Sequence, residues 1–293
     1  MKLVLLSDLH LVSFESLRTR DFFTKRSLAW MNLRFNRKDA VKGGSIARLA
    51  IQRVKALQPD HILFTGDFSN MALPSEFELA RDVLAPIWDP ARLSVVPGNH
   101  DYYALDSVKA HTFEHYFREL IWGASGGTAY PGIKTIAPNV ALLLFRSTHY
   151  LPGILSFGWV SNTQIKRAKS ALQALKPAFT IAAFHHNLHR RGLMSELTGR
   201  MLKRKQLKAN LLNLGVKLVL TGHDHHHLEY PVQKKGQSMD VICSGSTTLT
   251  TSKHLPGFTL IELDPKQPEK PIKIKVFSYR PEIGDFIDET NAG

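Results

Sequence analysis

Short apolar runs and amphipathic stretches alternate along the chain. Nine runs have the length of a buried strand and are rich in aliphatic and β-branched residues: 2–7, 61–65, 93–96, 140–146, 179–184, 218–221, 239–243, 258–263 and 272–278. Between them, apolar residues at helical spacing predict one helix that begins at Ser45 and ends before Pro59, and others over 75–88, 161–175 and 195–214. Because strands and helices alternate over the first two thirds, we expect largely parallel pairing there and antiparallel pairing in the strand-rich last third. The pattern predicts an α/β fold.

Length and composition are those of a globular protein with a full core. The chain has 293 residues, of which 43% are apolar and 22% charged, and it shows no repeat or linker, so we expect a single domain over residues 1–293. Asp8 interrupts the first apolar run well before the length of a signal-peptide core. The single cysteine, Cys243, cannot form an intrachain disulfide, which fits a reducing compartment and favours a cytoplasmic location.

The net charge of +13 is concentrated in two segments. Residues 18–42 hold eight basic and two acidic side chains, and residues 187–208 hold seven basic side chains and one acidic one. Each segment therefore contributes +6, which together is nearly the whole excess. A focused positive field attracts phosphates, whether on a small substrate, a nucleic acid or a lipid headgroup.

Polar residues of metal-binding types follow five of the predicted strands. They are Asp8 and His10 after the first run, Asp67 after the second, Asn99, His100 and Asp101 after the third, His185 after the fifth, and His223 and His225 after the sixth. Taken singly, each has an ordinary explanation as a turn former, a helix cap or a core histidine. Ligand sites in open α/β sheets form outside the carboxyl ends of the strands, so we expect all five endings to converge on one crevice.

Seven of these side chains are candidate metal ligands, which is more than one tetrahedral ion needs. Two divalent ions are therefore predicted, and imidazole with carboxylate suits Mn, Fe, Zn, Co or Ni, of which we expect Mn or Fe. If Asp67 bridges the two ions, one takes Asp8, His10, Asp67 and His225, and the other takes Asp67, Asn99, His185 and His223.

The order of these motifs resembles that of the calcineurin-like metallophosphoesterases. Asp-x-His, Gly-Asp, Gly-Asn-His-Asp, His and Gly-His-x-His appear complete and in sequence over residues 1–227. The resemblance implies an αββα sandwich, in which two mixed β-sheets are flanked by helices and the metal site lies at the strand C-terminal ends. It also implies that His185 rather than His186 is a ligand, and that His223 and His225 bind rather than His226 and His227.

The resemblance implies hydrolysis of a phosphate ester. Two cations about 3.5–4 Å apart would hold a bridging hydroxide that attacks phosphorus in line with the leaving oxygen. We expect His100 to protonate that oxygen, with Asn70 and Asp101 as further catalytic residues. Some relatives pair this histidine with the last carboxylate of a Gly-Asp-x-x-Asp motif. This chain has Asn70 at that position, so the partner would be a side-chain amide, and relatives acting on diesters also show asparagine there. A phosphodiesterase or pyrophosphatase is therefore expected before a phosphomonoesterase, a nuclease or a non-catalytic binding platform.

A basic and aromatic insertion at about 14–42 bears on the substrate. It could pack its aromatic residues on the protein's own core, contact anionic lipid through residues 18–42, or bind nucleic acid, which is the least favoured of the three. Together with the second basic segment, 187–208, it would surround the crevice with positive charge and so favour a polyanionic or lipid-linked substrate, such as a nucleotide-activated acyl sugar. A soluble cyclic nucleotide or glycerophosphodiester is the alternative. Lipid contact would place a cytoplasmic protein peripherally at the inner face of the membrane.

Overall fold

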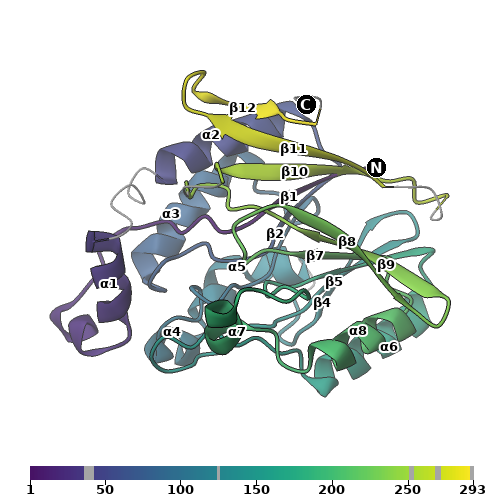
Figure 1. The fold of residues 1–293 in the computed structure, drawn as a ribbon, viewed down its shortest axis with the longest axis horizontal. Helices are drawn as coiled ribbons and strands as arrows, with labels where there is room; N and C mark the ends of the chain where they lie inside the picture. The colour runs from purple at the N-terminus through teal and green to yellow at the C-terminus, as the bar shows by residue number, and fades with distance from the viewer. Residues whose placement is uncertain (36–42, 124–125, 251–253, 268–271, 291–293) are drawn as a thin grey trace.

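The computed structural model describes residues 1–35, 43–123, 126–250, 254–267 and 272–290, and within these ranges the strands form two six-stranded sheets (Figure 1). The first sheet has the order β12-β11-β10-β1-β2-β3. Its strands are β1 (Lys2–Leu6), β2 (His61–Phe64), β3 (Leu93–Val95), β10 (Gly257–Glu262), β11 (Lys273–Arg280) and β12 (Asp285–Asp288). The first three are parallel to one another and the last three pair antiparallel, which makes the sheet mixed.

The second sheet has the order β4-β5-β6-β7-β9-β8. Its strands are β4 (Gly132–Ala137), β5 (Val140–Leu144), β6 (Phe179–Ala183), β7 (Leu218–Thr221), β8 (Leu228–Lys234) and β9 (Gln237–Cys243). The four central strands are parallel, whereas β4 and β8 add antiparallel at the two edges. Parallel strands are buried on both faces, which explains why their sequences read as continuous apolar runs.

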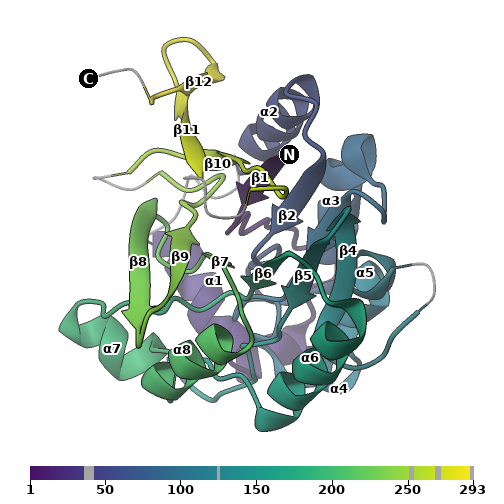
Figure 2. The ribbon, with the colours of Figure 1, turned by 90° about the vertical axis from the view of Figure 1, so that its right-hand side faces the viewer.

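The two sheets pack face to face, and helices cover their outer faces. Leu3, Leu5 and Leu63 of the first sheet share a buried cluster with Leu142 and Ile181 of the second. The outer face of the first sheet packs against α2 (Gly43–Ala56), α3 (Pro74–Leu84) and α5 (Thr112–Trp122), and that of the second against α6 (Asn162–Leu175) and α8 (Arg204–Asn213) (Figure 2). The expected αββα sandwich of two mixed sheets is confirmed.

Five further helical elements complete the described part of the chain. They are the 3-10 helices η1 (Thr19–Phe23) and η3 (Ala85–Ile87), and the helices α1 (Arg26–Phe35), α4 (Leu105–Lys109) and α7 (Leu193–Gly199). The single helix predicted over 195–214 is wrong, because Arg200 is extended and its carbonyl accepts a hydrogen bond from Gly158 N at 3.1 Å, which separates α7 from α8. Residues 36–42 of the predicted insertion lie outside the described residues.

Candidate metal centre

The candidate ligands lie in the loops at the carboxyl ends of β1, β2, β3, β6 and β7. Five of them have a left-handed backbone: φ is +56° at Asp8, +44° at His10, +56° at Asp67, +75° at His223 and +60° at His225. This conformation costs about 1–2 kcal/mol for a residue with a Cβ, and it persists where the surroundings enforce it, commonly at functional sites. The strain is concentrated where the side chains must converge.

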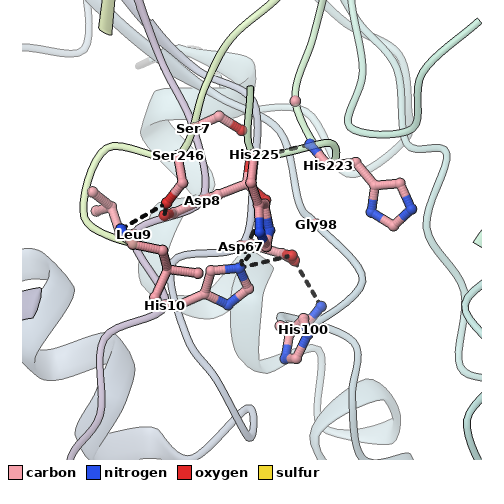
Figure 3. A network of polar contacts seen from close by, with 12 residues as sticks. Ser7, Asp8, Leu9, His10, Asp67, Gly98, His100, His223, His225 and Ser246 are labelled. Atoms are coloured by element: carbon pink, nitrogen blue, oxygen red, sulfur yellow. Dashed lines mark hydrogen bonds and ion pairs between the residues drawn. The ribbon is translucent and has the colours of Figure 1, made fainter. Parts of the chain in front are cut away.

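A first group of donor atoms forms around Asp8. The Nε2 atom of His225 lies 3.2 Å from Asp8 Oδ1 and 3.1 Å from His10 Nε2. His10 Nε2 is in turn 3.7 Å from Asp8 Oδ1 and 3.7 Å from Asp67 Oδ2. Figure 3 shows these side chains pointing toward one another from three separate loops.

A second group forms on the other side of Asp67. His185 Nε2 lies 3.4 Å from Asp67 Oδ2, 3.0 Å from Asn99 Oδ1 and 3.2 Å from His223 Nδ1. The same oxygen of Asp67 therefore faces both groups. The structure thus brings all seven predicted ligands together, in the two sets that a bridging Asp67 requires.

The donor set fits a pair of divalent ions. Asp8 Oδ1 is buried and, among the described residues, accepts no hydrogen bond, although it is directed at the imidazoles of the first group. Carboxylate, amide and imidazole groups that converge this closely suit transition-metal ions. One ion could be held by Asp8, His10, Asp67 and His225, and the other by Asp67, Asn99, His185 and His223.

Hydrogen bonds outside the donor groups orient the imidazoles. His185 Nδ1 donates to the Thr65 carbonyl at 2.7 Å, which directs Nε2 toward Asp67. His223 Nε2 donates to the Gly199 carbonyl at 3.2 Å, which directs Nδ1 toward the second group. Such contacts select the tautomer that presents a lone pair to the metal. His186 instead engages Ser147 Oγ and the Ser156 carbonyl through its two ring nitrogens, so it lies outside both groups.

The protonation of Asp67 and that of its neighbouring imidazoles depend on each other. Burial alone would raise the pKa of the Asp67 carboxyl, but the imidazoles of His185, His100 and His10 hold it well below its usual range. Burial lowers the pKa of His223 well below its usual value. Burial would lower the pKa of His185, but the Asp67 carboxylate raises it to about 9. An ionised carboxylate and a neutral imidazole are the forms that bind a metal ion, so Asp67 and His223 favour binding, whereas His185 would release a proton.

His100 lies beside the first group. Its main-chain N–H donates to Asp67 Oδ1 at 2.7 Å, and its ring meets that of His10 edge-on with centroids 4.7 Å apart. His100 Nδ1 donates to the main-chain carbonyl of Asn70 at 2.8 Å, whereas the sequence had indicated the Asn70 side-chain amide as the partner. Because Nδ1 is engaged in this way, Nε2 is the atom with which the ring can act on a substrate.

Asp101, which the sequence indicated as a further catalytic residue, joins two of the ligand loops. Its side chain is buried, and Oδ2 accepts hydrogen bonds from the main-chain nitrogens of Asp67 and Gly98 at 2.9 and 2.8 Å. Oδ1 accepts from Ser69 N and Ser69 Oγ at 2.9 and 3.0 Å. Both oxygens are therefore used to join the loops after β2 and β3, and the carboxylate does not face a substrate.

Sequence reasoning missed the loop after β9, which supports the loop that carries Asp8. Ser246 Oγ donates to the Asp8 carbonyl and Thr248 Oγ1 donates to the Leu9 carbonyl, each at 2.6 Å. Thr247 N donates to the Ser7 carbonyl at 2.9 Å. The signal was present as a further polar strand ending, Ser-Gly-Ser-Thr-Thr, after the run 239–243.

Glycines precede three of the ligands because the loops approach one another closely. A Cβ at Gly98 would lie 2.1 Å from Asp67 Oδ1, and a Cβ at Gly222 would lie 1.9 Å from Ser7 Oγ. Neither distance can be tolerated without movement of the ligand loop. The glycines therefore allow the strand endings to pack against one another.

Gly98→Ala is expected to displace Asp67 and to lower the activity of the metal-loaded protein about 10²-fold or more, since a shift of about 1 Å at a reacting centre has an effect of this size. Steady-state kinetics and metal content measure the loss. Gly44→Ala is the matched control, because nothing lies within 4 Å of its Cβ position and it belongs to α2. If both variants keep full activity and two ions, the close approach at Gly98 does not hold the site.

Fold and site together define a phosphoesterase fold with ligands for two metal ions at the strand ends. The family model of the calcineurin-like phosphoesterases matches residues 1–227, and the chain belongs to this family. It is a hydrolase family with a dimetal site, for which the cluster of Asp8, Asp67 and the histidines described above is the candidate. A comparison with curated proteins found no matching sequence.

Solved structures with the same fold include dimetal enzymes. A dimetal phosphatase from Danio rerio is 14% identical with a TM-score of 0.58, over 98% of each chain. The purple acid phosphatase PPD1 from yellow lupin is 12% identical with a TM-score of 0.52, over 98% of this chain and 52% of that one. A 5'-nucleotidase precursor from Thermus thermophilus is 14% identical with a TM-score of 0.50, over 98% and 56%. At this identity the likeness shows the fold alone.

Proposed function

We propose that the protein hydrolyses a phosphodiester or pyrophosphate bond with two divalent metal ions, Mn or Fe, bound at the candidate centre. The observation that carries the proposal is the position of Asp67, whose Oδ2 atom lies 3.7 Å from His10 Nε2 and 3.4 Å from His185 Nε2. One carboxylate can therefore serve two ions that are only a few ångströms apart. Asp8 and Asp67 supply the negative charge that holds them.

When bound, two such ions lower the pKa of water and neutralise the charge on phosphate. The chain's own residues provide the rest. Asp67 Oδ1 accepts the main-chain N–H of His100, which fixes this loop relative to the ligands. His100, oriented by the Asn70 carbonyl, protonates the leaving oxygen through Nε2.

Two features support a diester or pyrophosphate over a simple monoester. Position 70 is an asparagine, as in relatives that act on diesters, although its main-chain carbonyl and not its side-chain amide contacts His100. The second feature is a groove of about 540 Å³ between η1 and α4, lined in part by Phe23, Leu105 and Tyr150. It offers an apolar surface to the second substituent of a diester, such as the lipid part of a lipid-linked substrate.

The groove adjoins the candidate acid. Lys25, which lines it, places Nζ 4.5 Å from the centre of the Tyr103 ring, and Tyr103 stacks on His100 with centroids 5.2 Å apart. Lys25 Nζ also donates to the Leu151 and Leu155 carbonyls. A substrate whose phosphate lies at the metals can therefore extend along the insertion.

A screen of the metal-loaded full chain tests this function. We expect turnover of a phosphodiester or pyrophosphate at least about tenfold faster, in kcat/KM, than turnover of a matched monoester, a preference of about 1.4 kcal/mol. Mn- and Fe-loaded protein are compared with Zn-loaded protein. Faster monoester turnover would make the protein a phosphomonoesterase, rapid cleavage of DNA or RNA would make it a nuclease, and no turnover of any ester would make it a binding platform.

A further inference from the structure

The most exposed large apolar side chains of the described residues gather on three segments. Phe23 of η1 is 89% exposed, Ile154 in the loop after β5 is 69% exposed, and Leu193 and Met194 at the start of α7 are 75% and 69% exposed. Phe22 of η1 and Leu197 of α7 add partly exposed apolar surface to these segments, as do Leu28 and Met31 on the neighbouring helix α1, and Leu105 lines a groove together with Phe23. Apolar surface of this kind marks an interaction site when it is contiguous.

Hydrogen bonds join the three segments into one face. Lys25 Nζ, next to η1, donates to the carbonyls of Leu151 and Leu155 at 3.0 and 3.1 Å. Ser156 N donates to the Thr198 carbonyl of α7 at 2.7 Å. In Figures 1 and 2, α7 lies in the lower half of the molecule, far from β12 at the top. We name η1, α1, the loop 150–155 and α7 the docking face.

The charge of this face is positive. Within its four segments, three basic residues (Arg20, Arg26 and Arg34) stand against two acidic ones (Asp21 and Glu196). Further exposed arginines directly flank these segments in the sequence: Arg18, Arg190 and Arg200. Asp21 contacts the buried Arg26 at 2.6 Å, and Glu196 contacts Arg204 at 2.6 Å, so the two acidic side chains of the docking face are both paired. Exposed apolar side chains with arginine and lysine around them match an anionic lipid surface. Its acyl region accepts the apolar side chains, and its headgroups attract the basic ones.

The docking face also borders the metal centre. The Gly199 carbonyl at the end of α7 accepts the hydrogen bond of His223, and the Ser156 carbonyl accepts that of His186. Tyr103 stacks between Lys25 and His100. A surface that rests on this face would therefore lie next to the site at which phosphate is hydrolysed.

We propose that the docking face binds an anionic lipid bilayer, with α7 and Ile154 inserting together with Phe23. The sequence indicated lipid contact for residues 18–42 alone; the structure adds α7 and the loop 150–155, and residues 36–42 lie outside the described part. The binding does not rest on the proposed function, because it needs no turnover. It would bring a lipid-linked phosphate to the metals without its full extraction into water.

Co-sedimentation of the metal-loaded full chain with vesicles tests the docking face. We expect binding to phosphatidylcholine vesicles that contain one quarter phosphatidylglycerol, weaker binding at high salt, and little binding to phosphatidylcholine alone. The double variant Leu193→Ser with Met194→Ser should lower the partition coefficient about 10- to 100-fold, because two inserted apolar side chains are lost. Leu175→Ser with Ile283→Ser is the matched control, since these residues are 47% and 61% exposed outside the docking face and should leave binding unchanged.

Three results would overturn the proposal. The first is equal vesicle binding by the α7 variant and the parent protein, and the second is equal binding to neutral and anionic vesicles. The third is a dimer in solution that dissociates in the α7 variant and not in the control variant, which would make the face an interface between copies of this chain. Turnover of a small soluble diester is measured on the same samples and should be unchanged in the α7 variant. Vesicle binding without turnover of any ester would reject the proposed function and keep the docking face.

Discussion

Asp67→Asn is expected to lower kcat/KM about 10²- to 10⁴-fold, because removing one member of a buried charged cluster typically costs about 3–5 kcal/mol. Asp67 is buried, and its Oδ2 atom faces both His10 and His185. An amide at this position removes the negative charge and can place N–H groups against the ions. The purified variant should hold fewer than two ions per chain by elemental analysis.

Asp82→Asn controls for the loss of a carboxylate as such. Asp82 Oδ2 pairs with Arg48 at 2.7 Å, but its side chain is 65% exposed, and exposed pairs contribute little. We expect this variant to keep its metal content and its activity within about twofold, since an exposed pair is worth about 0–1 kcal/mol. Two bound ions and near-parent activity in Asp67→Asn would show that the two donor groups do not share Asp67.

The central strands could be predicted from sequence because both of their faces are buried. The residues of β1 and β5 face a helix layer on one side and the opposite sheet on the other, so their sequences are continuously apolar. The edge strands β8 and β12 were not predicted, since LEYPVQK and DFID bury only part of one face and contain polar residues or proline. The strand pattern is clearest where both faces are covered.

Helix α1 shows why the insertion could not be interpreted from spacing alone. Leu28 and Met31 lie on one apolar stripe in sequence, yet they are 37% and 44% exposed. The side that packs inward carries Arg26, Ala29 and Leu33, and Arg26 donates to the Met71 and Ala72 carbonyls. A buried arginine with carbonyl and carboxylate partners anchors the helix, and the apolar stripe is left at the surface.

The ligand positions followed from the strand endings, but the supporting residues did not. Sequence could place Asp101 and Asn70 near His100 without showing which atoms meet. The structure shows that Asp101 accepts four hydrogen bonds from donors in the loops. It also shows that His100 donates to the main-chain carbonyl of Asn70 and not to its side chain. Residue type alone does not distinguish a catalytic carboxylate from one that joins two loops, because both need a buried acidic side chain.

His100→Ala is expected to lower kcat about 10²- to 10⁴-fold on a diester with an alkyl leaving group, the range typical of a lost general acid. The loss should be much smaller on bis(p-nitrophenyl) phosphate, because p-nitrophenolate leaves without protonation. Both substrates are compared in single-turnover and steady-state kinetics of the metal-loaded variant. The dependence on the leaving group separates proton donation from support of the neighbouring His10, which would affect both substrates equally.

Asn70→Ser provides the matched variant, because it changes the side chain and keeps the main-chain carbonyl that lies 2.8 Å from His100 Nδ1. We expect it to cost less than about tenfold, the effect of one side-chain hydrogen bond. A loss as large as that of His100→Ala would return the role to the Asn70 side chain. An equal loss on both substrates in His100→Ala would mean that His100 only positions the ligands, since an acid matters most where the leaving oxygen is most basic.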